Sequence, residues 1–236
     1  MGELIKYIDV CKSFGEKQIL KNVNLTFDEN KIIGVVGKNG SGKTTLFKLA
    51  NDLLVPSSGE VLIDGKKVGV ETKKLVAFLP ERTYLDKNIK VENAIEMFAD
   101  FYDNFDKQKA EKLLTDLKLD KNMKLSKMSK GMKEKLQLVL VMSRHAKLYI
   151  LDEPLGGVDP ITRDYILDTI LQNFDEGASL VISTHLISDI ERILDEVVFV
   201  DDGKIILHES ADELRQKHKA SIDEIFRRGI YVKQVD

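Results

Sequence analysis

The sequence of 236 residues is long enough for one large domain, and its 43% hydrophobic residues can supply a buried core. Lysine and arginine number 36 against 39 aspartate and glutamate, so the net charge of −3 argues against a protein that binds nucleic acid. The single cysteine, Cys11, excludes an internal disulfide framework and fits a reducing cytoplasm.

The beginning of the chain alternates apolar and polar residues. The pattern covers LIKYIDVCKSF and ILKNVNLTF and returns in GEVLIDG at 59–65. Alternation of this kind predicts an antiparallel sheet beside the main one. The first residues do not have the pattern of a secretory signal, and no apolar run approaches the ~20 residues of a membrane-spanning helix. Any membrane role is therefore expected to come through a partner.

A glycine-rich loop follows the apolar run IIGVV at 32–36. The segment GKNGSGKT at 37–44 fits G-x-x-x-x-G-K-[ST] between a predicted strand and a predicted helix, the context that this phosphate-binding motif requires. Lys43 supplies a charge to the terminal phosphates and Thr44 a hydroxyl ligand to Mg²⁺, and an ordinary glycine turn needs neither. The expected nucleotide-binding residues here are Gly37, Asn39, Gly40, Ser41, Gly42, Lys43, Thr44 and Thr45.

Further runs rich in Val and Ile occur at 75–79, 148–151, 179–183 and 196–200 and alternate with segments of helical period. They predict a largely parallel sheet covered by helices. Between about 88 and 145 the strand signals vanish, and three helices are expected. The predicted fold is an α/β P-loop nucleoside triphosphatase with a mixed central sheet, an N-terminal antiparallel β subdomain and an inserted all-helical subdomain.

Two carboxylates, Asp152 and Glu153, end the predicted strand at 148–151. Alone, an acidic pair in this place is often only a solvated loop. Together with the phosphate loop it predicts an active site at the end of the sheet. Asp152 would hold Mg²⁺ through water, and Glu153 would orient or deprotonate the attacking water.

The segment MSKGM at 128–132 resembles the signature, usually LSGGQ, of the ATP-binding cassette (ABC) family. The resemblance implies that Ser129 and the backbone of Gly131, at a helix N-terminus, contact the γ-phosphate of ATP held by a second subunit. Ser129 is also an ordinary helix N-cap, and this structural role is compatible with the functional one.

Other elements similar to those of the ABC family follow in the expected order. Phe14 stands where the family places an aromatic that stacks on adenine, although an aromatic in a strand is more often core. The loop GVDP at 157–160, with Asp159, resembles the loop that links two active sites across a dimer. His185, in STHLISD, matches the switch histidine that contacts the γ-phosphate, and it joins Glu153 and Lys43 as an expected catalytic residue.

The chain departs from the common ABC pattern at three positions. Glu81, in FLPERTYL, replaces the usual Gln that touches Mg²⁺, and a carboxylate can serve as that ligand. Lys130 and Met132 replace a Gly and the final Gln of the signature. The combination of LPER with SKGMK resembles ATPases that are paired with separately encoded exporter permeases.

Two further segments have a structural and a functional interpretation. The aromatic residues Phe98, Phe101, Tyr102 and Phe105 have helical spacing, which favours core packing over a docking groove for a permease helix. The segment IDEIF at 222–226 resembles a motif that closes many exporter subunits, and simple edge packing would also explain it. We expect residues 1–208 to form the nucleotide-binding domain and 209–236 a helical tail packed on it.

The resemblance implies an ATPase that uses ATP and Mg²⁺, pairs with a second ATPase subunit, expected to be identical, and drives an integral-membrane permease without binding nucleic acid. Such a subunit would be cytoplasmic and peripheral on the inner face of the membrane. The alternative is a soluble ABC ATPase of translation or DNA repair, which predicts two cassettes or a long coiled-coil insertion. A P-loop kinase or GTPase would not need Ser129 or His185, and a nucleotide sensor without hydrolysis would not need Glu153.

Overall fold

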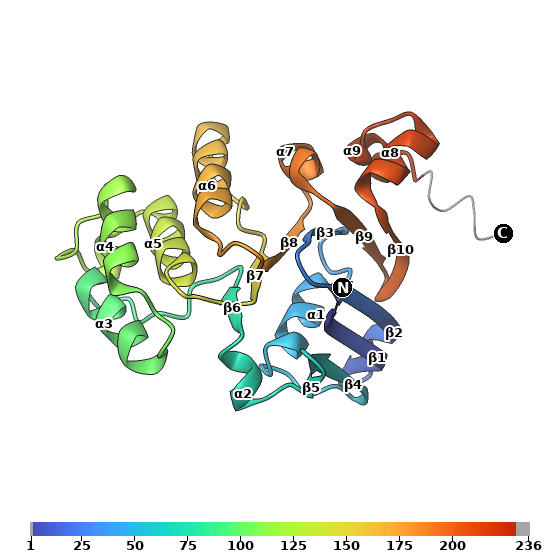
Figure 1. The fold of residues 1–236 in the computed structure, drawn as a ribbon, viewed down its shortest axis with the longest axis horizontal. Coiled ribbons are helices and arrows are strands. Elements are labelled where there is room, and N and C mark those ends of the chain that lie inside the picture. Colours follow the sequence, from blue (N-terminus) through green and yellow to red (C-terminus); the bar gives the residue numbers. More distant parts are fainter. Residues whose placement is uncertain (1, 230–236) are drawn as a thin grey trace.

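Two β-sheets organise the fold in the computed structural model, which describes residues 2–229 (Figure 1). The larger sheet has the strand order β10-β9-β3-β8-β7-β6. Its strands are β3 (Ile32–Val36), β6 (Val76–Leu79), β7 (Leu148–Asp152), β8 (Ser179–Thr184), β9 (Glu196–Asp201) and β10 (Lys204–Ser210). Neighbouring strands are parallel except β10, which runs antiparallel to β9. The prediction of a mixed sheet is therefore confirmed.

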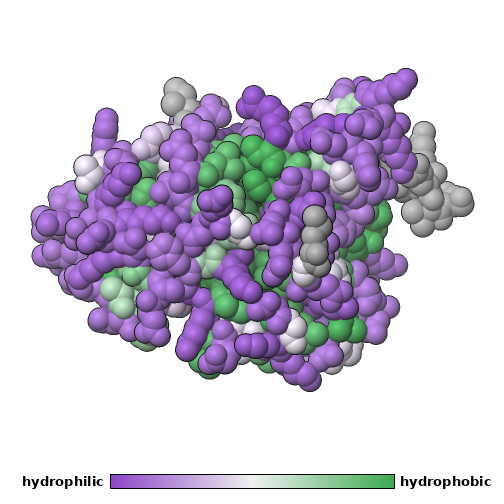
Figure 2. Space-filling model, in the orientation of Figure 1, coloured by the Kyte–Doolittle hydropathy of each residue, from purple (hydrophilic) through white to green (hydrophobic). Residues whose placement is uncertain are grey.

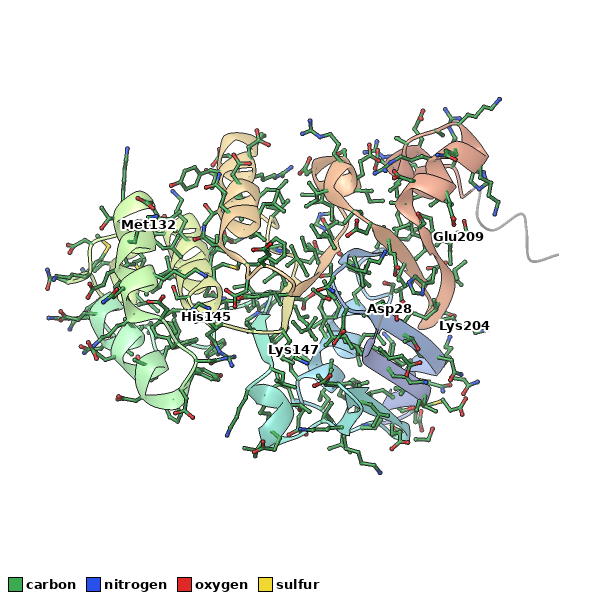
Figure 3. All side chains as sticks on the ribbon, viewed as in Figure 1. Asp28, Met132, His145, Lys147, Lys204 and Glu209 are labelled. Carbon is green, nitrogen blue, oxygen red and sulfur yellow. The ribbon has the colours of Figure 1, made fainter. Side chains whose placement is uncertain are left out.

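The smaller sheet is antiparallel and has the order β2-β1-β4-β5. Its strands are β1 (Glu3–Phe14), β2 (Lys17–Asp28), β4 (Ser58–Ile63) and β5 (Lys66–Lys67). The prediction of an antiparallel N-terminal sheet is confirmed. Lys147, labelled in Figure 3, lies just before β7 and reaches the small sheet, where it pairs with Asp64 at 3.2 Å.

Alternate residues of the large sheet face two different hydrophobic clusters. In β7, Leu148 and Ile150 pack into the cluster shared with α1 (Lys43–Ala50) and the small sheet. Tyr149 and Leu151 pack into the cluster formed with the other helices. Both faces are thus covered, which explains why the parallel strands are continuous apolar runs. Helix α1 lies between the two sheets and directly follows the phosphate loop.

The predicted helical insertion forms one end of the molecule, at the left of Figure 1. It contains α3 (Val91–Phe101), α4 (Lys107–Asp116), the short 3₁₀ helix η1 (Leu125–Lys127) and α5 (Lys130–Met142). The expectation of three α-helices is confirmed. Every residue of 136–142 is buried, so the second half of α5 attaches this region to the core.

The remaining helices cover the large sheet and its C-terminal edge. They are α2 (Val70–Lys73), α6 (Pro160–Asn173), α7 (Ile187–Ile190), η2 (Glu191–Ile193), α8 (Ala211–His218) and α9 (Ile222–Arg227). Ile222 and Ile225 are fully buried, and the Phe226 ring lies 5.2 Å from that of Phe199, so the 222–226 segment packs on the core. The expected tail begins later than 209 because β10 continues to Ser210, and its residues 230–236 lie outside the described residues.

Hydrophilic side chains cover most of the face shown in Figure 2. Within residues 2–229, no helix combines the length and the apolar character that crossing a bilayer requires.

Candidate nucleotide site

The loop between β3 and α1 is shaped by its glycines. Gly40 and Gly42 have left-handed φ angles of +83° and +115°, which side chains disfavour. A Cβ atom at Gly37 would lie 2.3 Å from the carbonyl oxygen of Val200, so only glycine fits there. Ser41 is buried, and its Oγ has no hydrogen-bond partner among the described residues. A buried donor in this position fits a site that phosphate oxygens complete.

Lys43, the first residue of α1, is buried at the centre of this loop. Its Nζ donates hydrogen bonds to the carbonyl oxygens of Gly37, at 2.7 Å, and Lys38, at 3.3 Å. The same Nζ lies 3.3 Å from Oε1 of Glu153, so the two side chains form an ion pair. The loop lysine and the acidic residue that follows β7 are therefore in contact.

Glu153 joins Lys43 to His185. Its second carboxylate oxygen, Oε2, lies 2.8 Å from Nδ1 of His185. The backbone N–H of Glu153 donates to Oγ of Ser183 at 2.9 Å, and its φ of 52° is left-handed, a strained value for a non-glycine residue. The structure thus brings together Lys43, Glu153 and His185, which the sequence analysis names as catalytic.

Asp152 lies at the end of β7 with 1% of its surface exposed. Its Oδ1 accepts a hydrogen bond of 2.6 Å from Oγ of Ser183, and its Oδ2 has no partner among the described residues. Burial raises the pKa of Asp152, the hydroxyl groups of Ser183 and Thr44 lower it, and the nearby charges of Glu81 and Glu153 raise it again. A bound cation would relieve this accumulation of negative charge.

The residues around Asp152 fit Mg²⁺ only if water and phosphates supply the remaining ligands. Within residues 2–229, no group of three or more His, Cys, Asp or Glu side chains could hold a metal on its own. Mg²⁺, however, usually takes one or two carboxylates and leaves its other positions to water and phosphates. Thr44, Glu81 and Asp152 line one cavity, and their hydroxyl and carboxylate oxygens fit that kind of donor set.

The other predicted residues lie around this centre. Phe14 ends β1 with 50% of its surface exposed, and Lys12 Nζ lies 5.0 Å from its ring centroid. Thr45 follows Thr44 in the first turn of α1. Asn39 lines a cavity of about 360 Å³ together with Glu153 and His185.

Ser129, Gly131 and Asp159 occupy the starts of two helices. The Oγ of Ser129 accepts a hydrogen bond from Met132 N at 3.2 Å and caps α5, while Asp159 caps α6. A Cβ at Gly131 would meet open space. Among the described residues, no hydrogen bond joins Ser129 to the phosphate loop, and its role across a dimer stays a prediction.

Ser183 is a site residue that the sequence analysis missed. It is fully buried in β8, directly opposite Asp152 in the strand register, and it bonds both Asp152 and the backbone of Glu153. The signal was a hydroxyl within the apolar run SLVIS. That signal becomes specific only when the pairing of β7 with β8 is known.

The chain resembles many ATP-binding proteins over most of its length. It is 28% identical to the ABC transporter ATP-binding protein YtrB of Bacillus subtilis, over 91% of this chain and 75% of that protein. It is 29% identical to the lantibiotic transport ATP-binding protein SrtF of Streptococcus pyogenes, over 89% of this chain and 92% of SrtF.

Solved structures have the same fold. An ATP-binding subunit of an ABC transporter matches with a TM-score of 0.84 and 27% identity, over 95% of this chain and 98% of that one. The dimeric cassette MJ0796, bound to ADP and Pi after hydrolysis, matches with a TM-score of 0.78 and 22% identity, over 88% of this chain and 99% of MJ0796. The sequence model of the family described as "ABC transporter" matches residues 20–156, more than half of the chain. The chain therefore belongs to the ABC transporter family, as an ATP-binding subunit.

Proposed function

We propose that this ABC ATPase hydrolyses ATP as one half of a dimer and thereby drives a separate membrane permease, with export as the direction of transport. The observation that carries the proposal is the contact between Lys43, Glu153 and His185 beside the glycine loop. The name of SrtF, a lantibiotic transport protein, supports transport, and the dimer of MJ0796 supports the two-subunit assembly.

Different residues of the chain would bind the phosphates and activate the attacking water. The loop 37–42 holds the phosphates through backbone N–H groups, and Lys43 exchanges Glu153 for phosphate oxygens. Glu153, released from Lys43 and oriented by His185, then accepts a proton from the attacking water. Mg²⁺ held by Thr44, Asp152 and Glu81 together with the phosphates would neutralise charge that builds up in the transition state.

The exposed start of α5 supports a site shared between two subunits. Ser129 caps α5 and lies on the surface, where backbone N–H groups of the first turn can point at a second molecule. In the proposed dimer, Ser129 and Gly131 of one subunit contact ATP held by the loop of the other. The nucleotide then bridges the halves, and its hydrolysis lets them separate, with Asp159 linking the two sites.

Ser129→Arg is expected to block ATP-driven dimerisation while ATP binding by the monomer stays unchanged, because the new side chain obstructs only the surface that meets the second subunit. Sedimentation with ATP in a Glu153→Gln background would measure the dimer, and titration calorimetry the binding. Thr115→Arg, on the exposed surface of α4, is the control for an added charge. Loss of ATP binding by the Ser129→Arg monomer would contradict the proposed arrangement.

A groove beside the site supports a permease partner. A cavity of about 700 Å³ runs from Thr44 and Asp152 to the aromatic residues of α3. Three exposed hydrophobic side chains line it: Leu53, Tyr84 and Phe101. Exposed apolar side chains that gather around one cavity are typical of an interaction site.

The lining of this groove holds four basic side chains and two acidic ones, Glu81 and Asp152. The guanidinium of Arg144 lies 3.8 Å from the ring centroid of Tyr102 and donates hydrogen bonds to two carbonyl oxygens. Lys48 and Arg82 add positive charge along the lining. The groove therefore suits an apolar helix that carries an acidic residue. Phe98 packs with Tyr102 and Phe105, as the spacing predicts. The predicted core packing of Phe101 is wrong, because its side chain is 77% exposed.

Phe101→Asp is expected to reduce recovery of a membrane permease by roughly tenfold, as expected for a central interface residue, without changing ATP hydrolysis by the isolated chain. The measurement is an affinity pull-down from detergent-solubilised membranes of the host, with mass spectrometry of the captured proteins. Val70→Asp is the matched control, since Val70 is 73% exposed but lies outside the groove. Recovery of a polytopic permease by wild type would also place the chain at the membrane surface; recovery of ribosomes would favour the soluble alternative.

A further inference from the structure

The segment 153–163 is linked to the segment 185–190 at two points. At the first, Oε2 of Glu153 lies 2.8 Å from Nδ1 of His185. At the second, Arg163 on α6 donates from Nε to the carbonyl oxygen of Val158, at 3.1 Å, and from Nη1 to Asp189 on α7, at 3.2 Å. Figure 1 shows α6 and α7 rising next to each other from the same edge of the sheet. The segments are therefore linked both beside the candidate site, at Glu153 and His185, and farther from it, at Arg163 and Asp189.

The contact of Arg163 with Val158 and Asp189 positions the two segments more than it stabilises the fold. The side chains of Arg163 and Asp189 are 26% and 29% exposed, so solvent weakens their attraction and leaves little net stability. A guanidinium, however, holds two acceptors in a fixed plane, which an ammonium group cannot do. Its two acceptors belong to different segments, and Ile187 and Ile190 anchor α7 in the core. Arg163 thus fixes the distance between the Val158 carbonyl and α7.

We propose that Arg163 is a positioning residue, which holds α7 against the loop 153–159 and so keeps His185 within reach of Glu153. The inference rests on the proposed function for the roles of Glu153 and His185. Arg163 touches neither the phosphate loop nor Lys43 in any hydrogen bond or ion pair among the described residues, so its effect on hydrolysis passes through Asp189 and α7.

Arg163→Gln and Asp189→Asn are each expected to lower kcat by roughly 2- to 30-fold, the range for residues that modulate a site without contacting it. The Kd for ATP should stay within about twofold of wild type, because the phosphate loop is unchanged. The double variant should lose no more activity than Arg163→Gln alone, because that substitution already removes the interaction with Asp189. Arg163→Lys should be intermediate. Arg227→Gln, which breaks an exposed pair on α9, is the matched control.

Hydrogen exchange on the nucleotide-free protein gives a readout that does not depend on hydrolysis. Amides of residues 185–190 are expected to exchange faster in Arg163→Gln than in wild type, and at the wild-type rate in Arg227→Gln. Unchanged exchange there, or losses of kcat that multiply in the double variant, would overturn the inference. If wild type itself failed to hydrolyse ATP, the proposed function would fail, and the exchange data would still test the junction.

Discussion

Glu153→Gln is expected to lower steady-state ATP hydrolysis by roughly 10²- to 10⁴-fold, the usual contribution of a general base. The amide cannot accept a proton from water, although it can still contact His185. ATP binding should persist or tighten, because the substitution removes the carboxylate that pairs with Lys43 at 3.3 Å. Phosphate release measures turnover, and titration calorimetry measures binding.

Glu176→Gln is the control for this substitution, since Glu176 is an exposed carboxylate after α6. It should hydrolyse ATP at the wild-type rate. Normal turnover by Glu153→Gln would show that another group activates the water and would remove Glu153 from the mechanism.

Lys43→Met is expected to weaken ATP binding by roughly 30-fold or more, the effect of truncating one partner of a buried charge pair. The methionine keeps much of the volume of the lysine stem and loses the ammonium group that is expected to reach the phosphates. Titration calorimetry with ATP measures the loss. Lys66→Met, on the exposed strand β5, should bind ATP normally.

Lys43→Met is also expected to change thermal stability, and a second substitution distinguishes this effect from the loss of ATP binding. In Lys43→Met the carboxylate of Glu153, only 11% exposed, loses its cation, so thermal stability should fall. Adding Glu153→Gln should restore stability, because the unpaired charge is gone, but it should not restore ATP binding. Recovery of binding in the double variant would show that Lys43 serves only to neutralise Glu153.

The main outline of the fold could be predicted from the sequence because its signals are local. The parallel strands are buried on both faces and appear as continuous apolar runs, and the phosphate loop carries its own spacing. Strand β10 was missed, since its residues alternate in a segment that leads into a charged tail. It forms because β9 offers an open edge, which depends on tertiary structure.

Most residues of the candidate site could be named from the sequence, but Ser183 and the contacts within the site could not. The position of Ser183 opposite Asp152 depends on strand register, and the ion pair of Lys43 with Glu153 joins residues 110 positions apart in number (153 − 43). The aromatic residues at the end of α3 also show that spacing alone does not predict contacts. Phe101 and Tyr102 both have helical spacing from Phe98, yet only Tyr102, which is half-buried, packs against the core.

The ion pair between Lys43 and Glu153 affects which anions can bind to the loop. Glu153 is a competitor tethered to the site by the fold, and such a group acts at an effective concentration that is commonly millimolar. A small free anion that meets only Lys43 must exceed that concentration to displace it. A nucleoside triphosphate can meet more of the loop's backbone donors through its several phosphates, so we expect it to displace Glu153 at lower concentration. We therefore expect the subunit to bind a nucleoside triphosphate in preference to inorganic phosphate, whose single group meets fewer of the loop's donors.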